Sequence, residues 1–174
     1  MPNSTAAHTF PDIRTETPAD HPAVEALLDH AFGPGRFTKV SERVREFARF
    51  RPDLSLCAWD SGHIVGSVRM SEVGIGSQEV IFLGPLAVMS DQRKAGLGGI
   101  LVQYACAAAE AAGVPVVLLV GDEPYFQRFG FSAAQTKGLI MPGPVDSRRV
   151  LARGAANPLV GRVKVLVEPP RGEA

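Results

Sequence analysis

The chain has 174 residues, a length that suits one domain and is too short for two ordinary ones. Hydrophobic residues make up 45% and charged residues 21%, which is the balance of a globular rather than a disordered protein. Lys plus Arg equals Asp plus Glu at 18 each, so no overall basic field would draw the protein to nucleic acid or membranes. Any anionic ligand must therefore be bound by a local site.

The cysteine content and the N-terminal segment set the expected compartment. Cys57 and Cys106 lie in apolar runs outside any CxxC or Cys/His cluster, so we expect buried free thiols and no metal site. The chain shows no signal-peptide pattern and no apolar run near the ~18 residues of a membrane span. We expect a cytoplasmic protein in which residues 1–8 form a flexible tail and residues 9–174 form one domain.

The first half of the chain predicts a strand, two helices and an antiparallel hairpin, in that order. The predicted ranges are 9–16, 17–33, 39–50, 54–60 and 64–73. Thr17 and Asp20 fit a capping box at the start of the first helix, and Gly33 ends it. Pro52 ends the second helix before the alternating pattern of the hairpin begins.

A strand–helix–strand unit follows in the second half. Residues 79–89 and 113–122 are apolar runs typical of buried strands, and residues 97–112 between them have a helical pattern. The right-handed crossover makes these two strands parallel. A short helix at 123–131 follows, and the Gly- and Pro-rich remainder has one strand signal at 161–168. The fold class is therefore α/β, with a mixed, mostly antiparallel sheet, a central parallel strand pair and flanking helices.

The start of the predicted 97–112 helix raises the main functional question. Arg93 and Lys94 precede Gly96, Gly98 and Gly99, although glycine is a poor helix former. The N–H groups at a helix N-terminus lack intrahelical partners, and the helix dipole makes that end positive. The pattern therefore predicts a cradle for a phosphate or pyrophosphate. The alternative is a loop-to-helix turn whose glycines pack against the strand.

Three known phosphate-binding patterns can be compared with this stretch. The P-loop pattern ends in GK[ST], which residues 98–100 do not supply. The dinucleotide fingerprint GxGxxG is half present, because Leu101 occupies its third glycine position, although Asp122 lies where a ribose-binding acid is expected. Residues 89–95 also separate the strand from the first glycine. The third pattern, [RQ]xxGx[GA], matches Arg93–Gly98 in full.

Two flanking segments make this third pattern specific. The strand segment LGPLAV precedes it at 83–88, and YFQRFGF follows at 125–131. With them the chain resembles the GCN5-related N-acetyltransferases (GNAT family), and within that family the small bacterial YhbS-type branch. The resemblance spans about residues 10–145 and is most specific over 80–131. It implies a single-domain acyltransferase that transfers an acetyl group from acetyl-CoA directly to a primary amine.

The resemblance also implies a set of CoA-binding residues. In that family acetyl-CoA binds where two parallel strands splay apart, which here are residues 81–88 and 115–121. The backbone of Leu86, Ala87 and Val88 is assigned to the pantetheine arm, and the N–H of Val88 to the oxyanion of the transition state. The pyrophosphate is assigned to the start of the helix, at Arg93, Lys94, Ala95, Gly96, Leu97, Gly98 and the adjacent Gly99.

The chain departs from the family pattern at the general acid. Many members carry a tyrosine four residues before the glycine of the final GF, and this position is Phe126 here. We expect Phe126 to form a wall of the thioester site. Tyr125 is adjacent but about 100° away around a helix, so it is either a replacement acid or a residue that packs against the CoA channel.

The sequence offers several carboxylates as the general base. Glu72 and Glu79 lie between the hairpin and the first core strand, and Asp122 follows the second splayed strand. A carboxylate can act as the base if desolvation raises its pKa. Each could equally be a solvated loop charge, and Asp122 could cap the next helix.

The acceptor is expected beside the first two helices, which carry several cations: Arg36, Lys39, Arg43 and Arg45. An acceptor with a carboxylate or phosphate is one interpretation, and a solvated helix face is the other. The acceptor amine could belong to a small metabolite or to a protein. Two further functional hypotheses stay open, a non-catalytic acyl-CoA-binding module and a dinucleotide-binding protein. The protein could be a monomer, or a homodimer that the strand at 161–167 helps to form.

Overall fold

The computed structural model describes residues 10–93 and 96–167. In this part of the chain a nine-stranded mixed sheet follows the path β1-β3-β4-β5-β6-β8, with β2 and β9 also paired to β4, and β7 paired to β9. The N-terminal elements are β1 (Asp12–Thr15), η1 (Pro18–Asp20), α1 (His21–Phe32), η2 (Pro34–Thr38), α2 (Val40–Arg45), β2 (Arg49–Phe50), β3 (Leu56–Asp60), β4 (His63–Ile75) and β5 (Gln78–Val88). The C-terminal elements are α3 (Ser90–Arg93), α4 (Leu97–Ala111), β6 (Val117–Val120), α5 (Glu123–Phe126), η3 (Gln127–Phe129), β7 (Gly138–Ile140), η4 (Ser147–Arg149), β8 (Val150–Arg153) and β9 (Val160–Lys164).

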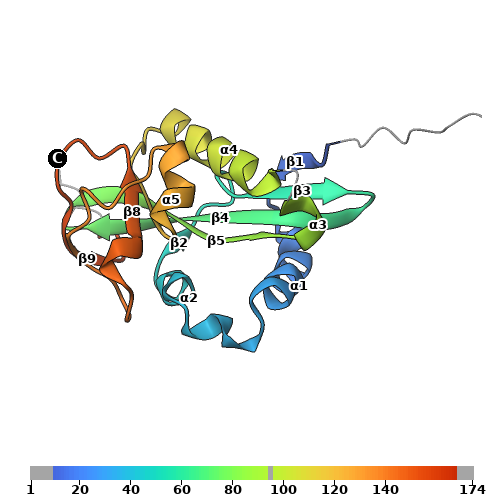
Figure 1. Cartoon of the computed structure of the whole chain (residues 1–174), viewed down its shortest axis with the longest axis horizontal. Coiled ribbons are helices and arrows are strands. Elements are labelled where there is room, and N and C mark those ends of the chain that lie inside the picture. The colour runs from blue at the N-terminus through green and yellow to red at the C-terminus, as the bar shows by residue number, and fades with distance from the viewer. Residues whose placement is uncertain (1–9, 94–95, 168–174) are drawn as a thin grey trace, which may run out of the picture.

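Helices cover both faces of the sheet. Figure 1 shows α4 on one face of the long strands, with α1 and α2 on the other. The α4 face buries the larger apolar cluster, which includes the fully buried Leu97, Leu101 and Leu119 side chains (0–1% exposed). Separate apolar clusters form under α1 and α2. This two-sided burial explains why β5 and β6 are nearly continuous apolar runs in the sequence.

The first helical region follows the sequence prediction at its ends. Thr17 and Asp20 form the predicted capping box at η1, and the chain continues directly into α1. Gly33 ends α1 with a φ of 69°, a left-handed value that glycine adopts without strain. The next segment then turns as η2 before α2 begins. The chain thus reverses its path at the end of α1.

The prediction of a helix over residues 39–50 is wrong in its second half. The α2 helix ends at Arg45, and Arg49 and Phe50 instead pair with Glu72 and Ser71 of β4. The helical spacing of apolar residues predicted a longer helix. Pairing with the uncovered edge of β4 overrides that local preference. The predicted hairpin is confirmed as β3 and β4.

The pairing of β4 with β5 contains a bulge that matters for the site. Val68 pairs with Leu86, but Met70 pairs with Leu83, so β5 contains one more residue than β4 over this stretch. The extra residue falls at Gly84–Pro85. A bulge bends its strand and changes the direction of the following backbone. Residues 86–88 of β5 therefore follow a redirected path.

The strands of the predicted βαβ unit are parallel and separate early. Only Ile81 with Val117 and Phe82 with Leu118 are in register between β5 and β6. Beyond these pairs β5 continues to Val88 without a β6 partner, so the two strands splay apart. The predicted fold class is confirmed, including the mixed sheet and its central parallel pair.

The C-terminal third contains two strands that the sequence prediction missed. β8 pairs antiparallel with β6, and the short β7 pairs with β9. β9 confirms the predicted strand signal, and its residues also pair with Gly74 and Ile75 of β4. The backbone of β9 is therefore paired with other strands of the same chain. The possible role of this strand in a homodimer stays a prediction. The expected flexible tail, residues 1–8, lies outside the described residues. None of the described helices is long and apolar enough to cross a membrane.

Candidate functional site

A cavity of about 470 Å³ lies where β5 and β6 separate. Its floor includes the bulged stretch 82–86 of β5, and residues 119–122 of β6 form the facing side. Phe126 and two loop segments complete the walls, residues 38–41 between η2 and α2, and residues 144–146 before η4. The cavity thus combines the splayed strands with three other parts of the chain, and Phe32 and Arg149 also line it.

A second hollow of about 340 Å³ adjoins the first along β5. Its lining residues are Ala31, Phe32, Leu86, Ala87, Val88, Gly98 and Tyr125. Phe32 and Leu86 line both hollows, so these two residues mark where the hollows meet. One hollow runs beside the strand toward the start of α4, and the other opens toward η2 and α2. The hollow of about 340 Å³ is called the strand-side hollow below. The cavity of about 470 Å³ is called the acceptor-side cavity.

The backbone of β5 faces the gap at alternate residues. The N–H of Met89 donates to the carbonyl of Val65 at 2.8 Å, which lies on the β4 side. Because successive backbone groups of a strand point to opposite edges, Val88 and Leu86 direct theirs toward the gap. The structure thus brings Leu86, Ala87 and Val88 together as a strand segment at the edge of the strand-side hollow.

The predicted phosphate cradle lies at the other end of this hollow. Gly96 is the N-cap of α4 and has a φ of 77°, which a residue with a side chain rarely adopts. A side chain carbon at Gly98 would lie 3.5 Å from the Tyr125 hydroxyl and 3.6 Å from a Val88 methyl group, both ordinary contact distances. Gly98 thus keeps a helix N-terminus open toward the hollow. Arg93 ends α3 just before it, whereas Lys94 and Ala95 lie outside the described residues.

Gly99 and Leu97 have packing roles in addition to their place in the motif. A side chain carbon at Gly99 would approach the Phe129 ring to 2.8 Å, closer than real contacts allow. Gly99 therefore lets η3 pack against α4, a packing role that differs from the predicted alternative of contact with the strand. Leu97 buries its side chain completely in the core, so only its backbone can reach a ligand.

The structure separates the two adjacent aromatic residues of α5. Phe126 lines the acceptor-side cavity and packs over Gly121, where any side chain carbon would overlap its ring. Tyr125 lines the strand-side hollow instead, with its hydroxyl over the first turn of α4. The two rings meet edge to face, with centroids 4.8 Å apart. The helical offset predicted for Tyr125 is therefore present, and the two side chains border different hollows.

The three carboxylates predicted as bases lie in two different places. Asp122 lines the acceptor-side cavity, where it accepts a hydrogen bond from Arg149 Nε at 3.2 Å, and its side chain does not cap α5. Glu72 and Glu79 line a separate hollow at the β2–β4 edge, where Glu72 pairs with Arg51 at 3.2 Å. Burial, and then its contact with Glu72, raises the pKa of Glu79. Only Asp122 of the three is placed at the splayed strands.

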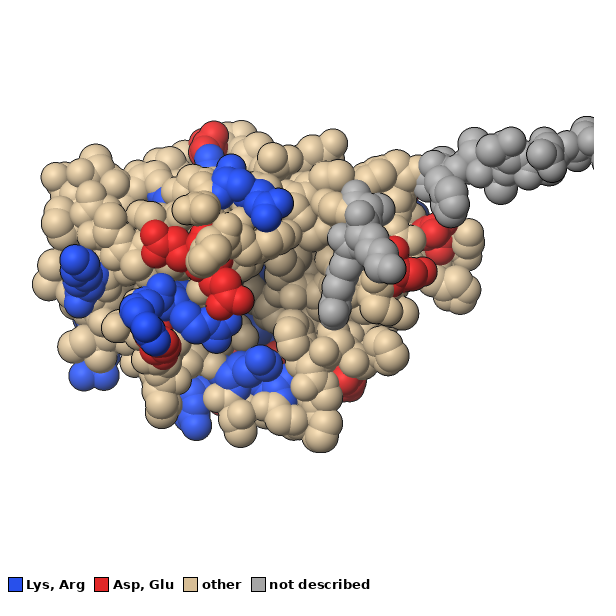
Figure 2. All heavy atoms as spheres, viewed as in Figure 1, with Lys and Arg blue, Asp and Glu red and all other residues tan. Residues whose placement is uncertain are grey.

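Sequence reasoning missed the residues that the loop before β8 contributes. Asp146 and Arg149 line the acceptor-side cavity beside Pro144 and Val145, because β8 pairs with β6 and brings the loop to this end of the sheet. Figure 2 shows acidic and basic side chains close together over this region of the face, with Lys and Arg side chains also gathered below, over η2 and α2. No local motif marks these residues, so the signal lies only in the pairing of β8.

The ionisable and potential metal-binding side chains can be described one by one. A hydrogen bond from Arg148 lowers the pKa of Asp146 to about 2, so this carboxylate stays ionised near neutral pH. Both cysteines are buried, and burial raises the pKa of the Cys57 thiol to about 12. Among residues 10–93 and 96–167, no group of three or more His, Cys, Asp or Glu side chains could hold a metal ion.

Comparison with known proteins identifies the family. The sequence model of the "Acetyltransferase (GNAT) family" matches residues 21–131, and the chain belongs to this family. Escherichia coli K12 has two similar curated proteins, both described as uncharacterised N-acetyltransferases. YhbS is 31% identical over 158 residues, covering 87% of this chain and 94% of that protein, and YjhQ is 27% identical over 132 residues, covering 73% of each. The predicted resemblance to the YhbS-type branch is confirmed.

Two solved structures match most of the chain. Escherichia coli YhbS in complex with CoA has a TM-score of 0.73 and 27% identity, and the match covers 90% of this chain and 89% of that one. A GNAT family acetyltransferase from Brucella melitensis in complex with acetyl-CoA has a TM-score of 0.65 and 26% identity, covering 88% and 94%. The predicted cosubstrate, acetyl-CoA, is that of the family.

Proposed function

We propose that this protein is an acetyl-CoA-dependent N-acetyltransferase that transfers the acetyl group directly to a primary amine. The observation that carries the proposal is the pair of hollows that meet at Leu86 and Phe32, beside the splayed strands. A thiol ester placed in the strand-side hollow would end at this junction. An amine in the acceptor-side cavity would then approach its carbonyl carbon from the other side.

The strand-side hollow suits the CoA part of the cosubstrate. The pantetheine arm would lie along Leu86, Ala87 and Val88 and hydrogen-bond to the gap-facing backbone groups of Leu86 and Val88. The pyrophosphate would lie on the first N–H groups of α4, where glycine at 96 and 98 lets an anion approach the positive end of the helix. Arg93 and Lys94 precede this helix and would add positive charge.

The reaction requires a deprotonated amine and a stabilised oxyanion. Two carboxylates line the acceptor-side cavity, Asp122 and Asp146. Asp122, which follows β6, would take the ammonium proton through a water molecule. The amine then attacks the thioester carbonyl, and a gap-facing N–H of β5 stabilises the oxyanion. Val88 is the donor expected from the family. Leu86 faces the same way and lines both hollows, so it lies nearer to the point of transfer.

The leaving group departs as the CoA thiolate in this scheme. Phe126, at the family tyrosine position, has no proton to donate. The Tyr125 hydroxyl lies over Gly98 and Gly99 rather than in the acceptor-side cavity, which favours a role in the CoA channel over one as general acid. When the tetrahedral intermediate collapses, the C–S bond breaks and the amide forms. The second proton of the attacking nitrogen passes to solvent, and the thiolate takes one proton from solvent.

The first test is calorimetric titration with acetyl-CoA, with NADH as the control ligand. Micromolar binding of acetyl-CoA alone is expected, and binding of NADH instead would favour the half-matched dinucleotide pattern. Release of free CoA thiol is then followed with a panel of primary amines. Binding without any amine-dependent release would contradict catalysis and support the non-catalytic acyl-CoA-binding module.

A further inference from the structure

We infer that Lys39 binds an anionic group, a carboxylate or a phosphate, on the amine acceptor. This inference rests on the proposed function and adds the substrate class. The acceptor would be a small amine with an acidic group on one side and an apolar body between the two charged ends. The argument starts from the charges that line the acceptor-side cavity and asks which of them already have partners.

Lys39 lines the cavity and has no carboxylate partner within residues 10–93 and 96–167. Its side chain is exposed, and its ammonium nitrogen lies 5.2 Å from the centre of the Phe32 ring. Phe32 is one of the two residues that border both hollows. The cation is therefore held near the junction where the transfer is proposed. A lysine ammonium is a compact charge on a flexible stem and can move toward an incoming anion.

The other charged side chains of the cavity are paired. Asp122 contacts Arg149 at 3.2 Å, and Asp146 contacts Arg148 at 2.8 Å. Arg148 lies outside the cavity lining, so the lining residues carry two cations, Lys39 and Arg149, and two carboxylates, Asp122 and Asp146. Because each carboxylate already has an arginine partner, Lys39 is the lining cation without a carboxylate partner among the described residues. An anion can satisfy this charge without breaking an existing pair. An acceptor with a second cation would instead meet like charge.

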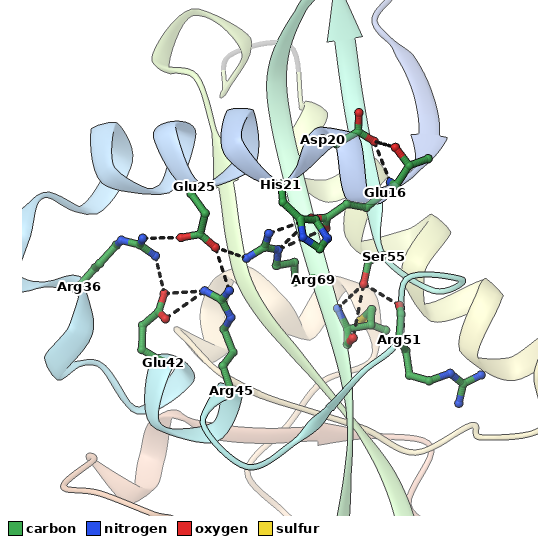
Figure 3. A network of polar contacts seen from close by, with 12 residues as sticks. Glu16, Asp20, His21, Glu25, Arg36, Glu42, Arg45, Arg51, Ser55 and Arg69 are labelled. Atoms are coloured by element: carbon green, nitrogen blue, oxygen red, sulfur yellow. Dashed lines mark hydrogen bonds and ion pairs between the residues drawn. The ribbon is translucent and has the colours of Figure 1, made fainter.

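Two of the four cations that the sequence offered here are used for structure. Arg36 is buried and donates from Nε to Asp29 at 2.7 Å, and from Nη2 to Glu25 at 2.5 Å. Figure 3 shows that Glu25 also contacts Arg45 and Arg69, so one carboxylate joins three guanidinium groups. Burial alone would raise the pKa of Glu25, but hydrogen bonds from these arginines lower it to about 2. Arg36 and Arg45 are thus unavailable to a ligand.

The same network fixes the wall that carries Lys39. Arg36 also donates from Nη1 to Glu42 at 2.8 Å, and these two residues bracket the cavity wall 38–41. Within the bracket, the N–H of Lys39 donates to the Arg36 carbonyl at 3.0 Å, and the Lys39 carbonyl accepts from Glu42 at 3.1 Å. The backbone of Lys39 is therefore held at the start of α2. The side chain of Lys39 can still rotate, while its backbone stays fixed at the wall of the cavity.

The remaining lining residues define the middle of the acceptor. The walls between Lys39 and the strands include the apolar side chains of Phe82, Phe126, Pro144 and Val145. An acceptor whose amine reaches Leu86 while its acid reaches Lys39 would place its carbon frame against these side chains. ω-Amino acids with an apolar chain and short phosphorylated amines meet this description, and the two are distinguished by experiment.

The test uses matched pairs of amines that differ only in the acidic group. ε-Aminocaproate is compared with ε-aminocaproamide, and O-phosphoethanolamine with ethanolamine, at saturating acetyl-CoA and low salt. We expect at least one acidic member to release CoA thiol about tenfold more efficiently than its neutral partner, as one charge-assisted hydrogen bond predicts. The pair that shows the preference identifies the acid as a carboxylate or a phosphate.

Variants assign the preference to Lys39. Lys39→Met keeps the length of the side chain and removes its charge, so it should abolish the preference, and Lys39→Arg should retain it. Lys137→Met, an exposed lysine outside both hollows, is the matched control and should change nothing. Acetyl-CoA affinity is measured for each variant. A loss of affinity in Lys39→Met would assign the cation to CoA and overturn the inference.

A binding measurement covers the case in which no amine of the panel is acetylated. The N-acetyl products of both members of each pair are titrated against the protein saturated with CoA, with thermal stabilisation as the readout. Stronger stabilisation by the acidic product in wild type, and not in Lys39→Met, supports the inference. Equal effects, or none, overturn it. Failure of acetyl-CoA itself to bind would overturn the proposed function instead.

Discussion

The two hollows of the site differ in the chemical groups and chain segments that form them. The strand-side hollow is bordered by the strand segment 86–88 and by Gly98 at the start of α4, together with the side chains of Phe32 and Tyr125. The acceptor-side cavity is formed by side chains from several segments that tertiary pairing brings together. A binding site made of backbone N–H groups requires glycine at particular positions of the first helical turn, so it leaves a motif with fixed spacing in the sequence. Side-chain sites have no such local rule, so a family can keep its cosubstrate while its acceptor changes.

This difference predicts which substitutions each hollow tolerates. On the strand side, most side chains can vary as long as the backbone remains accessible and follows the same path. On the acceptor side, single side chains such as Lys39 set the chemistry, and the ion-pair network behind residues 38–41 sets their position. Substitutions that separate cosubstrate binding from acceptor selection therefore test the comparison directly.

The largest effect is expected when backbone access at α4 is blocked. Gly98→Val should reduce acetyl-CoA affinity about 100-fold, because about two charge-assisted hydrogen bonds to the anion would be lost. A β-carbon at this position would have ordinary contact distances, and the two further methyl groups of valine make a measurement of stability necessary. Calorimetry measures affinity, and thermal unfolding measures the fold. Unaltered affinity in a folded Gly98→Val protein would contradict the phosphate cradle.

Gly99→Ala is the matched control for this prediction. Its new methyl group would meet the Phe129 ring, so it should lower the free energy of unfolding by about 1–3 kcal/mol through overpacking. We expect the remaining folded protein to bind acetyl-CoA within a few fold of wild type. The two neighbouring glycines would then differ in effect. Substitution of Gly98 would lower acetyl-CoA affinity, and substitution of Gly99 would lower the free energy of unfolding.

A smaller loss of affinity is expected from reversing charge beside the cradle. Arg93→Glu places a carboxylate next to the proposed pyrophosphate site and should weaken acetyl-CoA binding about tenfold at low salt. The effect should shrink as salt rises, because exposed charges are screened. Titrations at two ionic strengths check this dependence, and a salt-independent loss would indicate structural damage instead of electrostatics.

The sequence predicted those features that a local pattern encodes. The capping box at Thr17 and Asp20, the βαβ unit and the glycine-rich helix start all follow from short-range spacing. The α2 boundary was wrong because the pairing of Arg49 and Phe50 with β4 depends on a strand edge about 20 residues away. Helical periodicity cannot register a competing partner that lies so far along the chain.

The candidate site divides in the same way. Residues 86–88 and 96–99 were predicted from the motif, and the structure places residues 86–88 and Gly98 around one hollow. Asp146 and Arg149 were missed because only the pairing of β8 with β6 brings them to the cavity. The choice among Glu72, Glu79 and Asp122 could not be made either, since it depends on which edge of the sheet each carboxylate occupies.

Acid titration tests the network that holds the acceptor wall. The folded pKa of Glu25 is about 2, below its unfolded value near 4.5, so its contribution to stability is present above pH 4.5 and lost as pH falls toward 2. Glu25→Gln should lower the free energy of unfolding by about 1 kcal/mol near neutral pH, a value discounted for the partial exposure of this carboxylate. The difference from wild type should narrow between pH 4.5 and pH 2. A constant difference across that range would contradict an ionic role.

The smallest effect is expected at the residue nearest the family tyrosine. Tyr125→Phe removes only a hydroxyl that lies over Gly98 and Gly99, so turnover should change less than about twofold, well below the 10²-fold or more that general acid catalysis contributes. Steady-state kinetics over a pH range checks this, because loss of an acid would also remove a limb of the pH profile.

Phe126→Tyr is the informative partner, since it places a phenol at the wall of the acceptor-side cavity, where a proton donor could reach the leaving thiolate. If Tyr125→Phe is inactive and Phe126→Tyr has no effect, the acid lies on the strand side of the junction, and the division of roles between the two hollows is wrong. If the first is active and the second faster, then the thiolate of the wild-type protein leaves unassisted, and the phenylalanine at 126 limits the rate without affecting the choice of acceptor.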